Sequence, residues 1–304
     1  MYFVRRLVLA IPLLLVISAL AFVLVRLAPG GPFDRERAPA SPEIERNLMA
    51  KYHLNEPVWK QYLEYLGDLA RGDFGVSLKY RDHSVSDIIA QGLPVSMLLG
   101  ALAFGFAMGL GLPVGFYTAA RRGRWQDYAG SFLAMLAVCI PGFVVAPLLI
   151  LIFSIKWRLL PVGLWETPWH MILPPVALGL FFAGKIARLM REGMLGAMQS
   201  EFVAAARAKG LGESRLLFKH AVRVAILPVV SYSGPMLADL LTGSFVIENI
   251  FQIPGIGVFL VNSALNRDYT LVVGLSLLYA VLLVALNLLV DFSYTLLDPR
   301  VKYE

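Results

Sequence analysis

The sequence predicts an all-α polytopic membrane protein with six transmembrane helices, and three observations lead to this prediction. First, 58% of the 304 residues are hydrophobic and only 16% are charged. Second, six mainly apolar stretches are each long enough to cross the hydrocarbon core of a bilayer, which takes about 20 residues in a helix. Third, basic residues gather in the short loops on one side of this pattern, as they do in cytoplasmic loops. Apolar runs of this length cannot face water, so the class is a polytopic membrane protein.

The first span is predicted within residues 1–27. Leu7 to Val25 is uncharged, with Ser18 as its only polar residue, and it follows Arg5 and Arg6. A secretory signal peptide has the same order of charge, but its apolar region covers about 7–15 residues and ends at a small-residue cleavage site. The run here is longer and lacks such a site, so an uncleaved helix is favoured over a signal peptide.

Residues 28–92 are predicted to form a small extracytoplasmic helical segment. Ser41 and Pro42 place an N-cap before a proline at the first helical position, so a helix is expected from there to about residue 52. A second helix is expected from Pro57. Ser84 and Asp87 have the spacing of a capping box at the start of a third.

Residues 93–304 are predicted to form a core of five further spans. Gly105 and Gly109, and then Gly111 and Gly115, offer close contact with another helix. Prolines at 141 and 147 are expected to break the third span. The five predicted spans cover residues 94–117, 128–155, 171–190, 226–247 and 269–290.

Charge in the short loops predicts that both termini are cytoplasmic. Three arginines lie between the second and third spans, and six basic residues lie between the fourth and fifth. The short loops on the opposite side hold only Lys156, Arg158 and Arg267. The positive-inside rule therefore places the loop of residues 191–223 in the cytoplasm.

The predicted cytoplasmic loop contains two short helices around a glycine turn. Ser200 is a candidate N-cap, and Gly210 stands where a left-handed C-cap residue belongs. A second helix is expected to restart at Gly212, with Leu217, Ala221 and Val224 on one face. A helix of about ten residues is marginal alone in water, so docking on another protein is a plausible source of stability. The alternative is an amphipathic hairpin without a partner.

The stretch AAARAKGLGES at 204–214, with Ile226, Leu227 and Pro228 after it, resembles the cytoplasmic EAA loop of permease subunits of ABC importers. Ala205, Ala206 and Gly210 match that motif in register, while Ala204 occupies its acidic position and Glu201 is the nearest acid. The resemblance implies that the hairpin couples to an ATPase. The residues assigned to this contact are Glu201, Ala205, Ala206, Arg207, Lys209, Gly210, Leu211 and Arg215.

Further motifs between residues 26 and 300 resemble the B-type permease of oligopeptide ABC importers, among them RLAPGGPF at 26–33, GDFG at 72–75 and NRDY at 266–269. This resemblance implies the type I importer permease fold in a bacterial inner membrane. It also implies a second permease subunit, two cytoplasmic ATPases and an extracytoplasmic peptide-binding protein. No cofactor is expected on this chain, because ATP and magnesium belong to the ATPases. Dipeptides, glutathione and nickel chelates remain alternative cargoes.

Asp239 lies well inside the fifth predicted span, where a charged group costs about 2.5–3.5 kcal/mol on insertion scales. Such a residue faces either an aqueous path or a polar partner on a neighbouring helix, and both alternatives stay open. Ser231 and Thr242 share the span, and Gly234 with Pro235 should loosen it. The turn containing Pro254, Gly255 and Gly257 is either an outer gate or a cap on the helix bundle.

Other functional classes find little support. Gly179 to Lys185 matches a phosphate-binding loop, but Ile186 cannot ligate magnesium, so Lys185 and Arg188 are expected to reach lipid headgroups instead. The four histidines have no metal-ligand spacing, and one cysteine excludes an internal disulfide. A secondary transporter would predict inverted repeats and paired intramembrane charges. A membrane-embedded enzyme would need catalytic groups, and the sequence offers no Ser-His-Asp set or intramembrane carboxylate pair. The chain is therefore expected to be non-catalytic.

Overall fold

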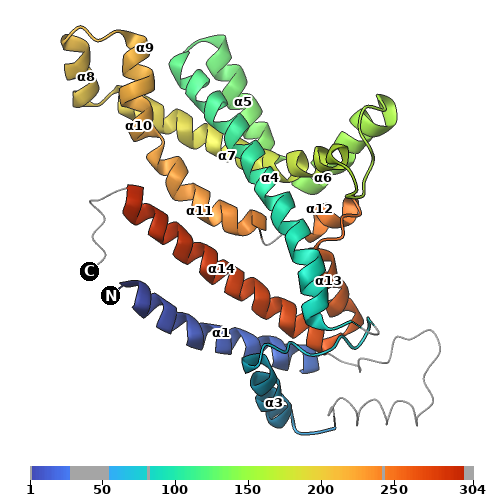
Figure 1. Cartoon of the computed structure of the whole chain (residues 1–304). Helices are drawn as coiled ribbons and strands as arrows, with labels where there is room; N and C mark the ends of the chain where they lie inside the picture. The colour runs from blue at the N-terminus through green and yellow to red at the C-terminus, as the bar shows by residue number, and fades with distance from the viewer. Residues whose placement is uncertain (1, 28–54, 81–82, 242–243, 298–304) are drawn as a thin grey trace. The chain divides into compact units, whose positions relative to one another are not determined.

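The computed structural model describes residues 2–27, 55–80, 83–241 and 244–297, and side chains from residue 8 to residue 289 within those ranges. The described residues form helices, joined by turns, and one isolated β-bridge between Val76 and Ser84 (Figure 1). Among the described residues, four helices are long and apolar enough to cross a membrane, and six spans result if each of two bent helix pairs counts as one. The helix expected at 41–52 lies outside the described residues.

Two compact units make up the chain. The first combines Met1–Val95 with Gly255–Glu304, and the second is Ser96–Pro254. Helix α4 (Val85–Ala120) begins in the first unit and continues into the second. Its start carries the predicted capping box, because the Ser84 amide donates to Asp87 Oδ2 at 3.1 Å and the Asp87 amide donates to Ser84 Oγ at 3.1 Å.

The first unit is built from α1 (Tyr2–Leu27), α3 (Val58–Ala70), α13 (Ile256–Asn266) and α14 (Tyr269–Leu297). Helix α1 packs along α14, so the first and last helices of the chain are neighbours. Helix α3 begins after Pro57, as expected, and packs against α1. The hydroxyl groups of Tyr62 and Ser18 lie 2.9 Å apart, and the Tyr62 ring contacts Phe22 edge-on at 5.2 Å between centroids.

A buried carboxylate organises the turn between α13 and α14. Asp268 is 1% exposed and accepts hydrogen bonds from the amides of Leu78, Lys79 and Leu271 at 3.1–3.2 Å. It also accepts from the Ser77 hydroxyl. The Leu271 contact caps the start of α14, while the other three tie the polar segment before α4 to the same point.

The second unit centres on α7 (Leu173–Met198), which is half buried over its apolar length. It packs against α5 (Trp125–Cys139), α6 (Gly142–Leu149), α10 (Val222–Ala225) and α11 (Leu227–Leu241). The remaining elements of the unit are short: the π-helix η1 (Ile150–Lys156), the 3-10 helix η2 (Pro168–Met171), α8 (Glu201–Ala208), α9 (Glu213–Arg215), the π-helix η3 (Leu216–Ala221) and α12 (Phe245–Ile250).

The second of the two predicted glycine pairs makes the close contact. A Cβ on Gly111 would lie 2.7 Å from the Ala183 carbonyl oxygen, and one on Gly115 would lie 2.3 Å from that of Ala187. Both distances are too short for any side chain, so glycine is what lets α4 approach α7. Gly105 and Gly109 have no described atom within 4 Å of such a position, and they take no part in this contact.

Several predicted spans differ from the observed helices, most clearly the third, fourth and fifth. The third is bent by 104° between α5 and α6, at the predicted break before Gly142. The second predicted break is wrong, because α6 continues through Pro147. Helix α7 continues to Met198 instead of ending near residue 190. The fifth ends at Leu241 and not at residue 247, because Ser244 caps a new helix, α12, and accepts from the Ile247 amide at 3.4 Å. Its bend, 47° at Ile226, precedes the Gly234-Pro235 pair, through which α11 is continuous.

Candidate coupling hairpin and pathway face

A polar hairpin follows the end of α7 and consists of α8, a glycine turn and the helical arm of residues 213–225 (Figure 1). Ser200 stands at the N-cap position of α8 with extended backbone angles, as predicted. Its hydroxyl, however, donates to the Ala197 carbonyl of α7 and accepts no hydrogen bond from the amides of α8. The predicted capping role of the Ser200 side chain is therefore wrong, since the side chain closes the preceding helix.

Gly210 makes the turn by adopting the left-handed conformation that was predicted for it, with φ of +81°. The Gly210 amide donates to the Arg207 carbonyl at 3.0 Å, and the Leu211 amide donates to the Ala206 carbonyl at 3.3 Å. This pair of bonds is the Schellman arrangement that ends a helix on a left-handed residue. Apart from its chain neighbours, no described residue has an atom within 4 Å of a Cβ at Gly210, so the requirement for glycine is conformational and not one of space.

The second arm buries a different face from the predicted one. Leu216 and Ala221 are fully buried and Ala225 is 1% exposed, whereas Val224 is 41% exposed. The predicted face of Leu217, Ala221 and Val224 assumed regular α-helical spacing. Because η3 is a π-helix, it inserts an extra residue into one turn, and the buried positions follow spacings of five and then four.

An ion pair joins the two arms across the turn. Arg207 Nε lies 2.7 Å from Glu213 Oε1, and Arg207 Nη2 lies 3.3 Å from Glu213 Oε2. This hydrogen-bonded carboxylate raises the pKa of the Arg207 guanidinium above its ordinary value. Glu213 was not among the predicted coupling residues. An acid six residues after an arginine, across a glycine turn, is the signal that would have indicated it.

One face of α8 is exposed in the part of the chain that the structure describes. Val203 is fully buried, while Phe202 on the adjacent side is 44% exposed. Six of the predicted coupling residues are exposed and two, Ala206 and Leu211, are half-buried. The exposed six are Glu201, Ala205, Arg207, Lys209, Gly210 and Arg215. Phe202 extends this surface and was missed, although an exposed aromatic beside small residues is typical of a contact surface.

Helix α11 separates an exposed polar face from a buried apolar one. Ser231, Pro235 and Asp239 are exposed at intervals of four residues. Val229 and Met236 on the other side are fully buried. Gly234 is buried with them, and Thr242 lies outside the described residues. The predicted pathway residues Ser231, Pro235 and Asp239 thus share one face, and their role stays a prediction.

The predicted outer turn follows α12, which a buried carboxylate attaches to α4. Glu248 is fully buried and accepts from the Ser96 hydroxyl at 2.7 Å. Its carbonyl accepts from the Ile253 amide at 2.8 Å. Glu248 was missed, although a lone acid in the apolar run Phe245–Phe251 was a signal.

The residues of the turn itself fall in different environments. Pro254 is exposed at the end of the second unit, while Gly255 and Gly257 are buried in the first. Whether these three form a gate stays a prediction.

A second missed pair holds α5 against α7 close to the hairpin. Arg191 Nε lies 2.7 Å from Asp127 Oδ1, and Arg191 Nη2 lies 3.0 Å from Asp127 Oδ2. The Gly123 amide also donates to Asp127, which is only 3% exposed. The pair is bidentate and mostly shielded from water, so it fixes the inner end of α7 from which the hairpin emerges.

The near-match to a phosphate-binding loop lies within α7. Ile186 is fully buried, and the Lys185 ammonium lies 4.9 Å from the Phe181 ring centroid and 5.2 Å from that of Tyr232. The Lys185 ammonium therefore contacts two aromatic rings, whereas Arg188 is exposed, and a contact of either with lipid headgroups stays a prediction.

The helical fold, its apolar spans and the exposed hairpin together define the permease class of membrane protein. A family model described as "Binding-protein-dependent transport system inner membrane component" matches residues 111–303. The chain belongs to this family and is a multi-pass inner membrane protein. Membership implies, in general terms, a partner ATPase and a substrate-binding protein.

Named relatives match from end to end. The chain is 47% identical over 301 residues to the oligopeptide transport system permease protein OppB of Haemophilus influenzae, covering 98% of each. It is 42% identical to the dipeptide transport system permease protein DppB of Bacillus subtilis, covering 99% of this chain and 97% of that protein. The MetNI methionine ABC transporter shares the fold, with a TM-score of 0.55 at 17% identity over 69% of this chain and 96% of that one.

Proposed function

We propose that this chain is the membrane-spanning permease subunit of an ATP-driven importer of oligopeptides. The observation that carries the proposal is the hairpin of residues 200–223, which is closed by Gly210 and braced by Arg207 and Glu213. Its exposed face lies where the resemblance to the ABC importer loop assigns ATPase contact. The oligopeptide cargo rests on the identity with OppB along nearly the whole chain.

The hairpin is built to move as one piece. The ion pair joins its two arms. Val203 is fully buried in the first arm, and Leu216 is fully buried in the second. Helix α10 and η3 both pack against α7. A push on the hairpin by a closing ATPase would therefore be delivered to α7, and then to α11, which packs on α7 as well. Packed helices transmit such displacements because interiors are hardly compressible.

The exposed face of α11 supplies this subunit's share of the pathway. A second permease subunit would face it, so that Ser231, Pro235 and Asp239 line a passage between the two. Nucleotide binding favours one of two pathway states, and its differential affinity provides the energy of the switch. Peptides carry amide and ammonium groups, which a polar face accommodates better than a purely apolar one.

This chain binds no nucleotide in the proposed mechanism. Two partner ATPases hold ATP and magnesium, an extracytoplasmic binding protein delivers the peptide, and the chain itself catalyses no reaction. Lys185 has no Ser or Thr after it for magnesium and stacks on aromatic rings. The relative at 42% identity is a dipeptide permease, which makes dipeptides the second candidate cargo.

The test is reconstitution of the chain with its partner subunits in proteoliposomes. Uptake of a labelled oligopeptide should require ATP on the side of the membrane that carries the ATPases. It should also require the binding protein and all membrane subunits. Affinity-tagged permease should also retain the ATPases during purification. Uptake by the permease alone, driven by an ion gradient, would instead indicate a secondary transporter. Preference for dipeptides in direct competition would reassign the cargo and leave the coupling mechanism intact.

A further inference from the structure

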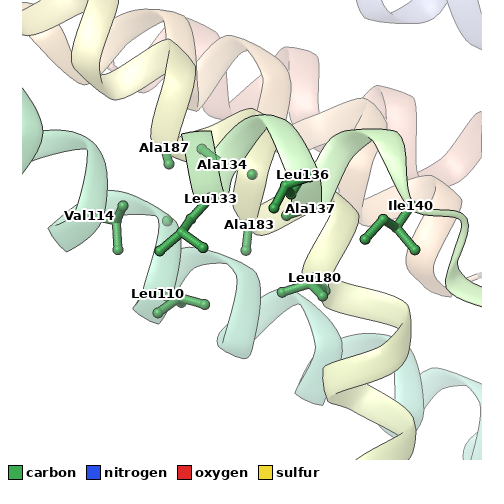
Figure 2. A pocket seen from close by; sticks show the side chains of 12 residues that line it. Leu110, Val114, Leu133, Ala134, Leu136, Ala137, Ile140, Leu180, Ala183 and Ala187 are labelled. Carbon is green, nitrogen blue, oxygen red and sulfur yellow. The ribbon is translucent and has the colours of Figure 1, made fainter. Parts of the chain in front are cut away.

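The second unit contains an apolar pocket between three helices, with a volume of about 320 Å³. Figure 2 shows side chains from α4, α5 and α7 around it. Leu110, Leu133, Ile140 and Leu180 supply bulky walls. Its size falls at the lower end of the range of small-molecule sites.

Small residues form the inner surface of this pocket. A Cβ on Gly184 would lie 2.6 Å from the Ala134 carbonyl oxygen and 3.0 Å from the Ala137 Cβ, so α5 and α7 are in direct contact there. All twelve lining residues are glycine, alanine, valine, leucine or isoleucine. A cavity without polar groups does not hold water, whereas it suits a hydrocarbon chain.

The turn that joins two of the pocket's walls is basic and aromatic. Arg122 and Arg124 are exposed, and no described residue forms an ion pair with either. Trp125 is 73% exposed and Tyr128 is 70% exposed on the first turn of α5. Exposed tryptophan and tyrosine beside arginine are typical of the headgroup level of a membrane.

The acid in this turn does not offset the arginines. Asp127 is buried and committed to Arg191 through two hydrogen bonds. Arg121 lies over the Tyr117 ring, 5.7 Å from its centroid, which leaves Arg122 and Arg124 as the outward-facing charges. The turn therefore presents net positive charge to whatever lies beside it.

The distance between the turn and the pocket allows one lipid molecule to reach both, with its headgroup at the turn and its acyl chain in the pocket. Val114 in the pocket wall precedes Arg121 by seven residues of α4, which is about 10 Å of helix. On α5, Leu133 follows Arg124 by nine residues, or about 13 Å. A headgroup at the turn would thus have its acyl chain at the depth of the pocket.

We propose that this pocket and the turn of residues 121–125 form a binding site for an anionic phospholipid, with its acyl chain between α4, α5 and α7 and its headgroup on Arg122 and Arg124. Basic sites between helices select anionic headgroups by charge, while the apolar pocket retains the chain. Because α7 carries the hairpin and α5 is tied to it by Asp127, the lipid would brace the helices that receive the ATPase's push.

The test uses photoreactive lipids in nanodiscs that contain the assembled transporter. Phosphatidylglycerol and phosphatidylcholine, each with the same diazirine on an acyl chain, are crosslinked in separate samples, and adducts are mapped by mass spectrometry. Phosphatidylglycerol should label the pocket residues at least about fivefold more strongly. The double variant Arg122→Gln, Arg124→Gln should remove this preference. The matched control Lys156→Gln, Arg158→Gln, next to the exposed Trp157, should keep it.

A second variant tests the pocket itself. Ala137→Phe fills the space and should lower adducts from both probes, in complexes that still assemble by size-exclusion chromatography. If that variant does not assemble, the arginine variants decide the question alone, because their side chains are exposed. Equal labelling by the two lipids would overturn the proposal. So would an unlabelled pocket in the assembled transporter, since another subunit would then cover it.

Discussion

Arg207 and Glu213 form a bidentate ion pair that spans the Gly210 turn, with 2.7 Å between Nε and Oε1. The two residues belong to different arms of the hairpin, and the backbone between them passes through a left-handed glycine. The turn and the ion pair thus set the angle between the arms. Variants of Gly210 and of Arg207 separate the contribution of the turn from that of the ion pair.

Gly210→Val should leave expression and membrane insertion intact while abolishing transport and the ATPase response to loaded binding protein. A β-branched residue is strained in the left-handed region, at a cost of about 1–2 kcal/mol. The matched control is Gly210→Asn, because asparagine tolerates this region and open space surrounds the position. Wild-type transport by Gly210→Val would show that the turn geometry is dispensable.

Reversal of charge at one end of the ion pair should lower transport severalfold, because Arg207→Glu places two acids across the turn. The exchanged pair Arg207→Glu, Glu213→Arg should recover most of the loss if the contact between arms is what matters. Peptide uptake into proteoliposomes measures both. Failure of the exchanged pair, with assembly unchanged, would indicate that Arg207 contacts the ATPase directly.

Asp127→Ala should destabilise the assembled transporter by about 3 kcal/mol, because it leaves the Arg191 guanidinium without its carboxylate in a largely buried site. Replacing both residues, Asp127→Leu with Arg191→Met, should recover much of this loss. The temperature at which the monodisperse complex disappears in fluorescence-detected chromatography measures the effect. No difference between Asp127→Ala and the wild type would mean that the pair contributes nothing to stability.

Asp239→Asn should keep the yield of the complex while reducing uptake of cationic peptides more than uptake of neutral ones. The substitution preserves size and hydrogen bonding and removes the charge that an exposed position on α11 offers to a passing ammonium group. Competition between a lysine-containing and an isosteric neutral peptide measures it. Equal losses for both, or a collapse in assembly, would assign Asp239 a structural role.

Features that depend on neighbouring residues could be predicted from the sequence. The capping box of Ser84 and Asp87 and the left-handed Gly210 both rest on backbone groups a few residues away, and both are found. The register of the second arm could not be predicted, because nothing in residues 216–221 distinguishes a π turn from an α turn. Val224 was therefore assigned to the wrong face.

The long-range pairs were out of reach for a different reason. Asp127 and Arg191 are 64 residues apart, and Ser96 and Glu248 are 152 apart, so only the packing of α4, α5, α7 and α12 brings them together. A charged residue inside an apolar run indicates that some partner exists, but periodicity along one helix does not identify it. Asp239 was selected by this argument, while Glu248, which is equally isolated in sequence, was not.

The carboxylate of Asp268 links the loop of residues 77–80 to the start of α14. The amides of Leu78 and Lys79 lie in an irregular segment, yet they donate to the same side chain that caps α14 through Leu271. Exchange of these amide protons with solvent requires that their hydrogen bonds to the Asp268 carboxylate break. Displacement of that carboxylate also removes the cap of α14. On the hydrogen-exchange timescale, this stretch of loop and the first turn of α14 should therefore open together, as one cooperative unit.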